Sequence, residues 1–320
     1  MPNPNWTEIL TTTLESRNKD FADNVSNSNA LLARLNQKGN VKSASGGNVI
    51  LEELEYAENS TFQFYTGYEI LDISPSDVFT AAEFDWKQAS VNVSASGLEV
   101  EVQNTGKERV IPLLEKRIQN AKRTAANNMS TSIYSDGTSY GGKEVGGLQL
   151  LIADDPTTGT VGGIDRSAAA NAFWRNQTSG DTALTTAAET RLEMQAMWLE
   201  TSRGRDTVDL IVTDQILYSF FWDSLTDIQR ISSDTTATAG FESLKYVTAD
   251  VIYDGDSGIP ANHMYFLNTD YIYLRPHSSR NWVPMDKKSS VNQDAMVVPM
   301  VWAGNMTCSN SARQGVVWTS

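Results

Sequence analysis

The chain has 320 residues, of which 40% are hydrophobic and 9% aromatic, and it carries a formal net charge of −14. This composition is typical of a globular protein with one large core or two modest ones, not of a disordered chain. No basic stripe is present, which argues against a nucleic-acid-binding protein. No apolar run approaches the roughly 18 residues of a membrane span, and the single cysteine, Cys308, excludes an intrachain disulfide.

The first 47 residues are polar and rich in Asn and Ser, and we expect residues 1–47 to form an extended or partly ordered arm. One short amphipathic stretch within them runs from Ala30 to Leu35. The beginning of the chain has neither a basic nor an apolar segment, so we expect no signal peptide.

Residues 48–106 are expected to form a long β-hairpin rich in aromatic side chains. Short runs within this segment are rich in β-branched and aromatic residues, and most alternate between polar and apolar, which is typical of strands: residues 48–56, 61–65, 91–95 and 98–102. Gly67 and Ser74-Pro75 between them favour turns. A lone two-stranded ribbon is marginally stable in water, and exposed aromatic residues promote aggregation.

Two interpretations of this hairpin are open. Its strands fold back onto the core of their own chain, or the hairpin docks onto a neighbouring copy. We favour docking when the resemblance described below is included. The apolar residues expected at that subunit interface are Phe62, Phe64, Tyr65, Tyr68, Phe79, Phe84 and Trp86.

A long amphipathic helix is expected to follow, from residue 107 to about residue 135. Its apolar residues recur at spacings of three and four, which places them on one stripe: Leu114, Ile118, Ala121, Ala125, Met129 and Ile133. The densest basic cluster of the chain lies off this stripe, at Lys116, Arg117, Lys122 and Arg123. Asp136-Gly137 is expected to end the helix. The stripe fits an ordinary core helix as well as a helix packed on another copy.

The remainder of the chain predicts a mixed α+β pattern without a repeating βαβ unit. A second helix is expected over residues 184–202, with Leu192, Ala196 and Leu199 on one face. A buried strand at residues 208–213 leads to Asp214, which is expected to cap a helix over residues 215–225. Further strands are expected at residues 241–253, 264–268, 271–274, 295–302 and 316–318.

No catalytic, cofactor-binding or metal-binding residue stands out in the sequence. The two histidines, His263 and His277, lie in no recognisable catalytic motif, and neither zinc-ligand spacing nor a phosphate-binding glycine loop is present. The acidic pairs at Asp154-Asp155 and at Asp254 and Asp256 are better explained as solvated turns than as cation sites. We therefore expect a structural protein and not an enzyme.

Several stretches are similar to a subfamily of tailed-bacteriophage major capsid proteins with the HK97-type fold. They are G-G-L-Q-L-L-I-A-D-D-P (146–156), T-G-T-V-G-G-I-D-R (158–166), A-F-W-R-N-Q (172–177), M-Y-F-L-N-T-D-Y (264–271) and M-V-V-P-M-V-W-A-G-N-M-T-C-S-N (296–310). The order of the parts also resembles that family, from about residue 48 to residue 318.

The resemblance implies an α+β, HK97-like capsid fold with a division into named parts. These are an N-terminal arm (1–47), an E-loop hairpin (48–106), a P domain (107–182 and 285–320) that includes the spine helix (107–135), and an A domain (183–284). It also implies self-assembly as hexamers and pentamers into an icosahedral phage head that encloses double-stranded DNA. Portal, scaffolding and cement proteins are the implied partners, and the implied location is the virion, assembled in the cytoplasm of a bacterial host.

Three rival functions stay open: an encapsulin-like protein compartment, an acidic enzyme that uses His263 or His277, and another virion component. One chemical alternative concerns Lys87, the only lysine between residues 48 and 106. The ordinary interpretation is a solvated lysine. The alternative is a covalent cross-link to Asn305 or Asn310 of a neighbouring copy.

Overall fold

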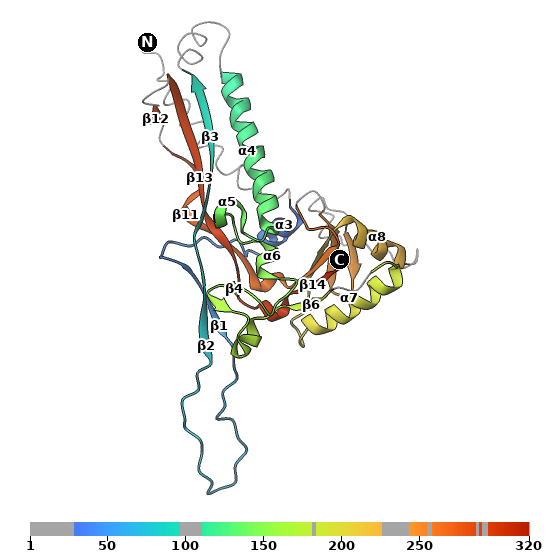
Figure 1. Cartoon of the computed structure of the whole chain (residues 1–320). Helices are drawn as coiled ribbons and strands as arrows, with labels where there is room; N and C mark the ends of the chain where they lie inside the picture. Colours follow the sequence, from blue (N-terminus) through green and yellow to red (C-terminus); the bar gives the residue numbers. More distant parts are fainter. Residues whose placement is uncertain are drawn as a thin grey trace.

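The computed structural model describes residues 29–96, 111–180, 184–225, 243–254, 258–285, 288–289 and 294–319. The described elements form an elongated molecule with three parts (Figure 1). A long sheet with a long helix beside it makes up one end, a hairpin projects from the other end, and a six-stranded sheet with two helices lies to one side. The expected α+β class is confirmed.

The projecting hairpin consists of β1 (Ile50–Glu55) and β2 (Phe79–Phe84), which pair antiparallel from Ile50–Phe84 to Glu55–Phe79. It is shorter than the expected segment 48–106. The expected strand at residues 61–65 has no strand partner, and β3 (Lys87–Ser96) turns away to pair with another sheet. The expected strand at residues 98–102 lies outside the described residues.

The long sheet is built around β13 (Ala295–Cys308), which pairs on one side with β3 and on the other with β11 (Ile272–Pro284) and β12 (Lys288–Ser289). The helix α4 (Ile111–Tyr134) packs against β3, with Ile118 and Ala121 in one apolar cluster with Val298. Five of the six expected stripe residues of α4 are buried: Ile118, Ala121, Ala125, Met129 and Ile133. The side chain of Leu114 lies outside the described residues.

The six-stranded sheet has the order β6 (Gln177–Ser179), β14 (Gly315–Trp318), β10 (His263–Leu267), β7 (Leu210–Thr213), β9 (Ala249–Tyr253) and β8 (Ser243–Tyr246). Alternate side chains of its strands point to opposite faces. Ile211 and Val251 join the cluster of α7 (Ala187–Thr201) and α8 (Gln215–Ser224), while Val212 and Ile252 join the main core. Both faces are therefore covered, which explains why all of β7 is buried.

Both helices on this sheet begin at caps that the sequence contains. Asp214 accepts a hydrogen bond from the Leu217 amide at 3.1 Å, as expected for α8. Thr186 and Glu189 form a capping box at the start of α7. The buried face of α7 differs from expectation, because Met194 and Met197 point inward.

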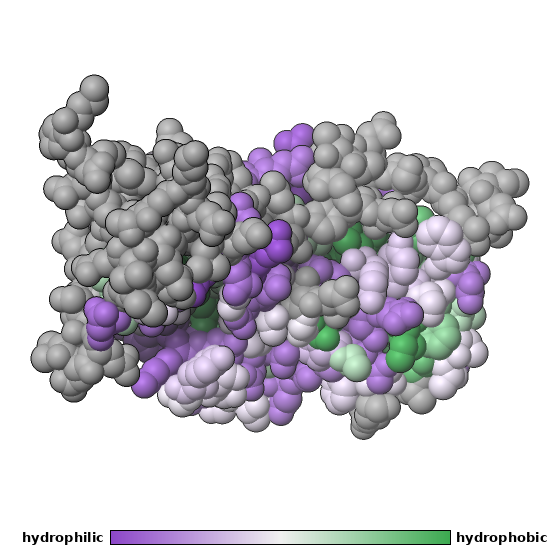
Figure 2. Space-filling model, turned by 90° about the horizontal axis from the view of Figure 1, so that it is seen from above, coloured by the Kyte–Doolittle hydropathy of each residue, from purple (hydrophilic) through white to green (hydrophobic). Residues whose placement is uncertain are grey.

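Leu192 and Leu199 lie on an exposed apolar face of α7, and they are 67% and 60% exposed. Figure 2 shows hydrophobic side chains reaching the surface at the end of the molecule that holds the six-stranded sheet and its helices. The periodicity of this helix is ambiguous because apolar residues lie on both of its faces.

Part of the expected N-terminal arm belongs to the folded core. The helix α3 (Ala30–Gln37) buries Leu31, Leu32 and Leu35, and the chain after it bonds to β11 through Lys42 N and Leu274 O at 3.0 Å. The amphipathic stretch at residues 30–35 was thus the start of an anchored helix. The described structure begins at residue 29, so the remainder of the expected arm lies outside it.

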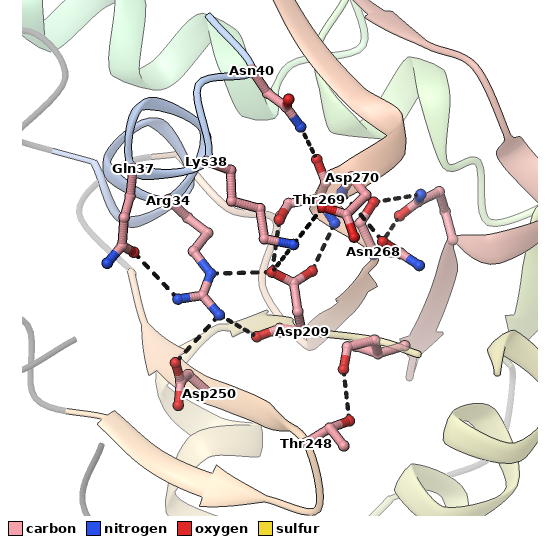
Figure 3. A network of polar contacts seen from close by, with 12 residues as sticks. Arg34, Gln37, Lys38, Asn40, Asp209, Thr248, Asp250, Asn268, Thr269 and Asp270 are labelled. Atoms are coloured by element: carbon pink, nitrogen blue, oxygen red, sulfur yellow. Dashed lines mark hydrogen bonds and ion pairs between the residues drawn. The ribbon is translucent and has the colours of Figure 1, made fainter. Parts of the chain in front are cut away.

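A polar network ties α3 to the six-stranded sheet (Figure 3). The Asp209 carboxylate accepts from Arg34 Nε at 3.1 Å and lies 3.0 Å from Lys38 Nζ. The same carboxylate accepts from the amide and the hydroxyl of Thr269, each at 2.7 Å. Asp209 therefore fixes α3, β7 and the turn at the start of β11 relative to one another.

The expected domain boundaries stay a prediction, and each sheet contains strands from both sides of them. The strand β11, in the expected A domain, pairs with β13 in the long sheet. The strand β14, in the expected P domain, lies between β6 and β10 in the six-stranded sheet. Short elements complete the chain: α5 (Ser139–Gly142), α6 (Leu148–Leu151), β4 (Thr160–Val161), β5 (Ile164–Asp165), η2 (Ala169–Trp174), η4 (Thr269–Tyr271) and η5 (Ser311–Arg313).

Candidate assembly surface

The loop between β1 and β2, residues 56–78, presents an unusual density of apolar side chains to solvent. We call it the hairpin loop. Of the eighteen large hydrophobic residues that are exposed in the described part of the chain, ten lie between residues 51 and 79. Phe64 and Ile70 are 92% and 95% exposed. Monomeric soluble proteins seldom expose so large a contiguous apolar surface unless it is an interaction site.

Short polar contacts shape the hairpin loop from within. The Ser60 and Ser76 hydroxyls lie 2.8 Å apart across it, and Gln63 Nε2 donates to the Ile70 carbonyl at 3.3 Å. A turn closes its tip, where the Glu69 amide donates to the Thr66 carbonyl at 3.1 Å. The aromatic side chains take no part in these contacts and are exposed to solvent.

The base of the hairpin is fixed to the rest of the chain by a buried ion pair. Glu52 in β1 is 6% exposed, and its carboxylate accepts from Arg275 Nε at 2.7 Å and from Arg275 Nη2 at 2.9 Å. Thr307 in β13 donates to the same carboxylate at 2.8 Å. Two-point pairing of this kind fixes orientation as well as distance. The hairpin therefore leaves the long sheet at a defined angle.

A glycine turn supports the hairpin base from its other strand. The Glu83 amide donates to the Gly162 carbonyl at 2.8 Å. Gly162 has a φ of +60°, and a Cβ built there would lie 2.9 Å from the Cβ of Ala82 and 3.1 Å from the ring of Phe84. Only glycine allows this backbone conformation and this close approach together.

The residues predicted for the interface divide into two groups. Phe62, Phe64, Tyr65, Tyr68 and Phe79 are all exposed in the single chain. Phe84 is only 5% exposed and belongs to the main core of its own chain. Trp86 is half-buried, and its indole Nε1 donates to the Gly47 carbonyl at 3.0 Å.

The expectation of an interface role is therefore corrected for Phe84. It alternates with Ala82 on the inward face of β2, and its ring packs beside Gly162. Sequence alternation predicted a strand there but not which face of the strand meets the core. Trp86 follows β2 and precedes β3, where the chain turns from the hairpin to the long sheet.

Of the two asparagines considered for a cross-link to Lys87, Asn305 is buried and already hydrogen-bonded within its own chain. Asn305 is 4% exposed, its Nδ2 donates to the Asp85 carbonyl at 2.9 Å, and its Oδ1 accepts from the Gly146 amide at 3.1 Å. An amide buried and bonded at both ends is unavailable to the lysine of another copy. Lys87 donates to the Gly142 carbonyl at 2.5 Å within its own chain.

The two histidines occupy different settings. His263 lies at the start of β10, with Nδ1 2.7 Å from the Ala261 carbonyl and Nε2 3.1 Å from an Asp154 oxygen. Burial by itself lowers the pKa of His263, but these two acceptors, together with the charges of Asp154 and Asp214, outweigh it and the net pKa is raised. His277 Nδ1 lies 3.0 Å from the Ser279 hydroxyl on the surface.

Two further buried groups among the described residues have shifted pKa values. Burial raises the pKa of the Cys308 thiol to about 12, so this cysteine is protonated at neutral pH. Burial lowers the pKa of Arg166 to about 10, which leaves it charged. Over the described residues, no group of three or more His, Cys, Asp or Glu side chains could hold a metal ion. Nor is any helix in that part of the chain long and apolar enough to cross a bilayer.

Sequence reasoning missed the residues that hold the hairpin in place. Glu52 and Arg275 are 223 positions apart in the chain, and neither belongs to a motif. A weak signal was present, because Glu52 interrupts the inward-facing positions of a strand that are otherwise apolar, Ile50 and Leu54. An acidic residue at such a position requires a buried partner.

Known structures share this architecture. No protein-family model and no curated protein matches the sequence. Among solved structures, the chain is similar to a subunit of the capsid asymmetric unit of cyanophage A-1(L), with 14% identity, a TM-score of 0.62, and coverage of 88% of this chain and 90% of that one.

Two further capsid structures match at comparable coverage. The capsid of a native GTA particle has 9% identity and a TM-score of 0.54 over 90% of each chain. The capsid of Myoviridae phage XM1 has 9% identity and a TM-score of 0.53 over 89% of this chain and 92% of that one. The chain therefore has the HK97-type fold of phage capsid proteins, which confirms the fold implied by the sequence resemblance.

Proposed function

We propose that this protein is the major capsid protein of a tailed bacteriophage. Copies of the chain associate as hexamers and pentamers and close an icosahedral shell. The observation that carries the proposal is the hairpin loop, whose aromatic surface is exposed while its base is held by the Glu52–Arg275 pair. Burial of each large apolar side chain stabilises an assembly by about 1.5–3 kcal/mol.

The similarity to capsid subunits supports the same proposal, since the matches cover 90%, 90% and 92% of those subunits. At such low sequence identity, these matches show a shared fold alone. The exposed hairpin loop adds a reason for assembly that is specific to this chain. The interface residues that follow are Phe62, Phe64, Tyr65, Tyr68 and Phe79, with Ile70 and Ile73 added because they are equally exposed.

The contents of the shell are proposed to be double-stranded DNA, enclosed without sequence-specific contacts. The net charge of −14 repels a polyanion on average, so containment fits the charge better than binding does. Portal, scaffolding and cement proteins are the proposed partners. The proposed location is the virion, with assembly in the cytoplasm of a bacterial host.

The test is assembly of a variant that combines Phe62→Ser with Phe64→Ser. Both side chains are exposed, so the folded subunit should keep its circular dichroism spectrum and its free energy of unfolding within about 0.5 kcal/mol. Closed particles should disappear from negative-stain micrographs. The matched control, Phe62→Leu with Phe64→Leu, keeps the apolar surface and should still assemble. Normal particles from the serine variant would refute the docking role of the loop.

A second measurement separates a virus head from a protein compartment. Particles purified from producing cells should contain DNA that resists external nuclease until the shell is opened. A stoichiometric protein cargo in place of DNA would assign the chain to an encapsulin-like compartment.

A further inference from the structure

The helix α4 exposes a face that carries basic and neutral polar side chains and no acidic one. The chain contains 39 Asp and Glu residues, but none lies from residue 116 to residue 135, where Lys116, Arg117, Lys122 and Arg123 occur. Over residues 117–134, whose side chains are described, the exposed residues are Gln119, Asn120, Arg123, Thr124, Asn127, Asn128 and Thr131. The net charge of −14 therefore describes the chain on average and not this face of α4.

The exposed residues form two adjacent rows, because residues four positions apart lie on the same side of a helix. One row is Gln119, Arg123, Asn127 and Thr131, and the other is Asn120, Thr124 and Asn128. The first row is roughly 18 Å long at 1.5 Å per residue. The opposite side of α4 holds the buried stripe, which packs into the clusters beside β3 and in the main core (Figure 1). The rows therefore lie on the side of α4 that the core leaves uncovered.

The basic residues of α4 have no ion-pair partner within the helix. Helical ion pairs form between residues three or four positions apart. None of the four Lys and Arg residues has an Asp or Glu at either spacing. Among the described residues, no carboxylate pairs with Arg123. The basic residues of α3 differ, since Arg34 and Lys38 both pair with Asp209. The exposed face of α4 therefore keeps a positive charge that an anion can neutralise.

The residue types on this face favour a nucleic acid over a protein as the anion. Hydrogen bonds to the phosphates and sugars of DNA come from Arg and Lys and from the side chains of Ser, Thr, Asn and Gln. Protein interfaces have an apolar core, but none of the exposed side chains in the described part of α4 is apolar. The exposed face of α7 differs, because it carries Leu192 and Leu199.

We propose that the exposed face of α4 contacts the phosphate backbone of double-stranded DNA inside the shell, without reading its sequence. Arg123 pairs with a phosphate oxygen, and the amides of Gln119 and Asn127 donate to phosphate or sugar oxygens beside it. Double-stranded DNA carries one charge per about 1.7 Å of its axis, so about ten phosphates lie along a row of about 18 Å. Each copy makes few of these contacts, and many copies meet the same polymer. This inference rests on the proposed function for the presence of DNA, and it adds the face that meets it.

The experiment attaches a photo-activated cross-linker to Asn127→Cys in DNA-filled particles from which external DNA has been removed by nuclease. The native Cys308 is 1% exposed, which protects it from the reagent. After illumination, subunits joined to DNA are separated from free subunits and both are quantified. The matched control is Gln195→Cys on the exposed side of α7. We expect at least tenfold more DNA-joined subunit from Asn127→Cys than from this control.

A charge variant tests the part played by Arg123. Arg123→Gln in the Asn127→Cys background should lower the yield of DNA-joined subunit at least threefold, because it removes the charged contact. Arg191→Gln removes one positive charge from the exposed side of α7 and should leave the yield unchanged. An equal yield with Arg123 and with Gln at this position would contradict the pairing with phosphate.

The outcomes separate this inference from the proposed function. DNA-filled particles in which Asn127→Cys captures no more DNA than the α7 control, or captures an acidic protein instead, would overturn the DNA-contacting role of α4 alone. Particles that contain no DNA would overturn the proposed contents of the shell, and this inference with them. Where Asn127→Cys fails to assemble, Gln119→Cys offers another exposed position in the same row and decides the question in the same way.

Discussion

The Glu52 carboxylate accepts two hydrogen bonds from the Arg275 guanidinium, at 2.7 and 2.9 Å. This pair joins the first strand of the projecting hairpin to the long sheet, and the Thr307 hydroxyl completes it. The hairpin is part of the core through Ile50, Leu54 and Phe84, and past Glu55 and Phe79 the hairpin loop extends into solvent. The pair therefore lies within the part of the hairpin that the subunit orders, and the hairpin loop beyond it is the part proposed to bind a partner.

Replacing Glu52 by Gln should lower the free energy of unfolding by about 2–4 kcal/mol, because it leaves the Arg275 charge without its carboxylate in a largely buried site. The neighbouring change Glu53→Gln alters an exposed residue on the opposite face of β1 and should change stability by less than about 0.5 kcal/mol. Urea unfolding measures both values. Equal effects from the two variants would show that the ion pair does not stabilise the hairpin base.

Replacing Gly162 by Ala should destabilise the subunit through both strain and crowding. Its φ of +60° disfavours any side chain, and the new Cβ would lie within 3.1 Å of Ala82 and Phe84. Gly159→Ala is the matched control, since Gly159 has a φ of +78° but nothing within 4 Å. The control should cost about 1–2 kcal/mol from backbone strain alone. Gly162→Ala should lower the free energy of unfolding by a further ~1–3 kcal/mol because of overpacking. Thermal or urea unfolding measures both variants. If Gly162→Ala is no less stable than Gly159→Ala, crowding against Ala82 and Phe84 does not destabilise the subunit.

The two faces of α7 should respond differently to substitution. Met194 is fully buried, so Met194→Ala should lower the free energy of unfolding by about 2–5 kcal/mol. Leu192→Ala changes an exposed side chain and should fall within about 0.5 kcal/mol of the parent chain. Chemical denaturation of the unassembled subunit measures both. A large loss of stability in the Leu192 variant would contradict the described orientation of the helix, in which Leu192 faces solvent.

The contribution of His263 to stability should fall as the pH rises. Both ring nitrogens face acceptors, the Ala261 carbonyl and the Asp154 carboxylate, so the doubly protonated ring is favoured in the folded chain and its pKa is raised above the usual 6.5. Stability from a raised pKa is fully present below the pKa of the unfolded state and is lost as pH rises through that of the folded state.

His263→Gln should therefore reduce the free energy of unfolding more at about pH 6 than at about pH 8. Asp154→Asn removes the carboxylate partner and should weaken the same pH dependence while keeping the histidine. Urea unfolding across this pH range gives the comparison. A His263→Gln effect that is constant with pH, or larger at the higher pH, would contradict the assigned pairing.

Local structure was predicted well where one segment contains its own signal. The stripe of α4, the Asp214 cap of α8 and the buried strand β7 all depend on residues within a few positions of one another. Phe62 and Phe64 are exposed in the single chain, as the docking interpretation requires, and the sequence favoured that interpretation only with the family resemblance included.

Pairing partners were the part that the sequence left open. The return strand of the expected hairpin, β3, pairs with β13, whose residues lie about two hundred positions later in the chain. The alternation in residues 91–95 predicts a strand equally well in either place. For the same reason the sequence did not predict which sheets β11 and β14 join, and Phe84 was expected at an interface and lies in the core of its own chain.

By itself the sequence determined the α+β class of the fold, its principal helices and the aromatic character of the hairpin, since short-range periodicity and composition encode these features. Only the tertiary structure decided which strands are neighbours, which face of α7 is covered, and that Glu52 meets Arg275. The physical reason is that hydrogen bonds between strands, buried ion pairs and close packing at glycine depend on contacts between distant residues. The sequence pattern indicates that Glu52 needs a buried partner, and the folded chain determines that Arg275 is that partner.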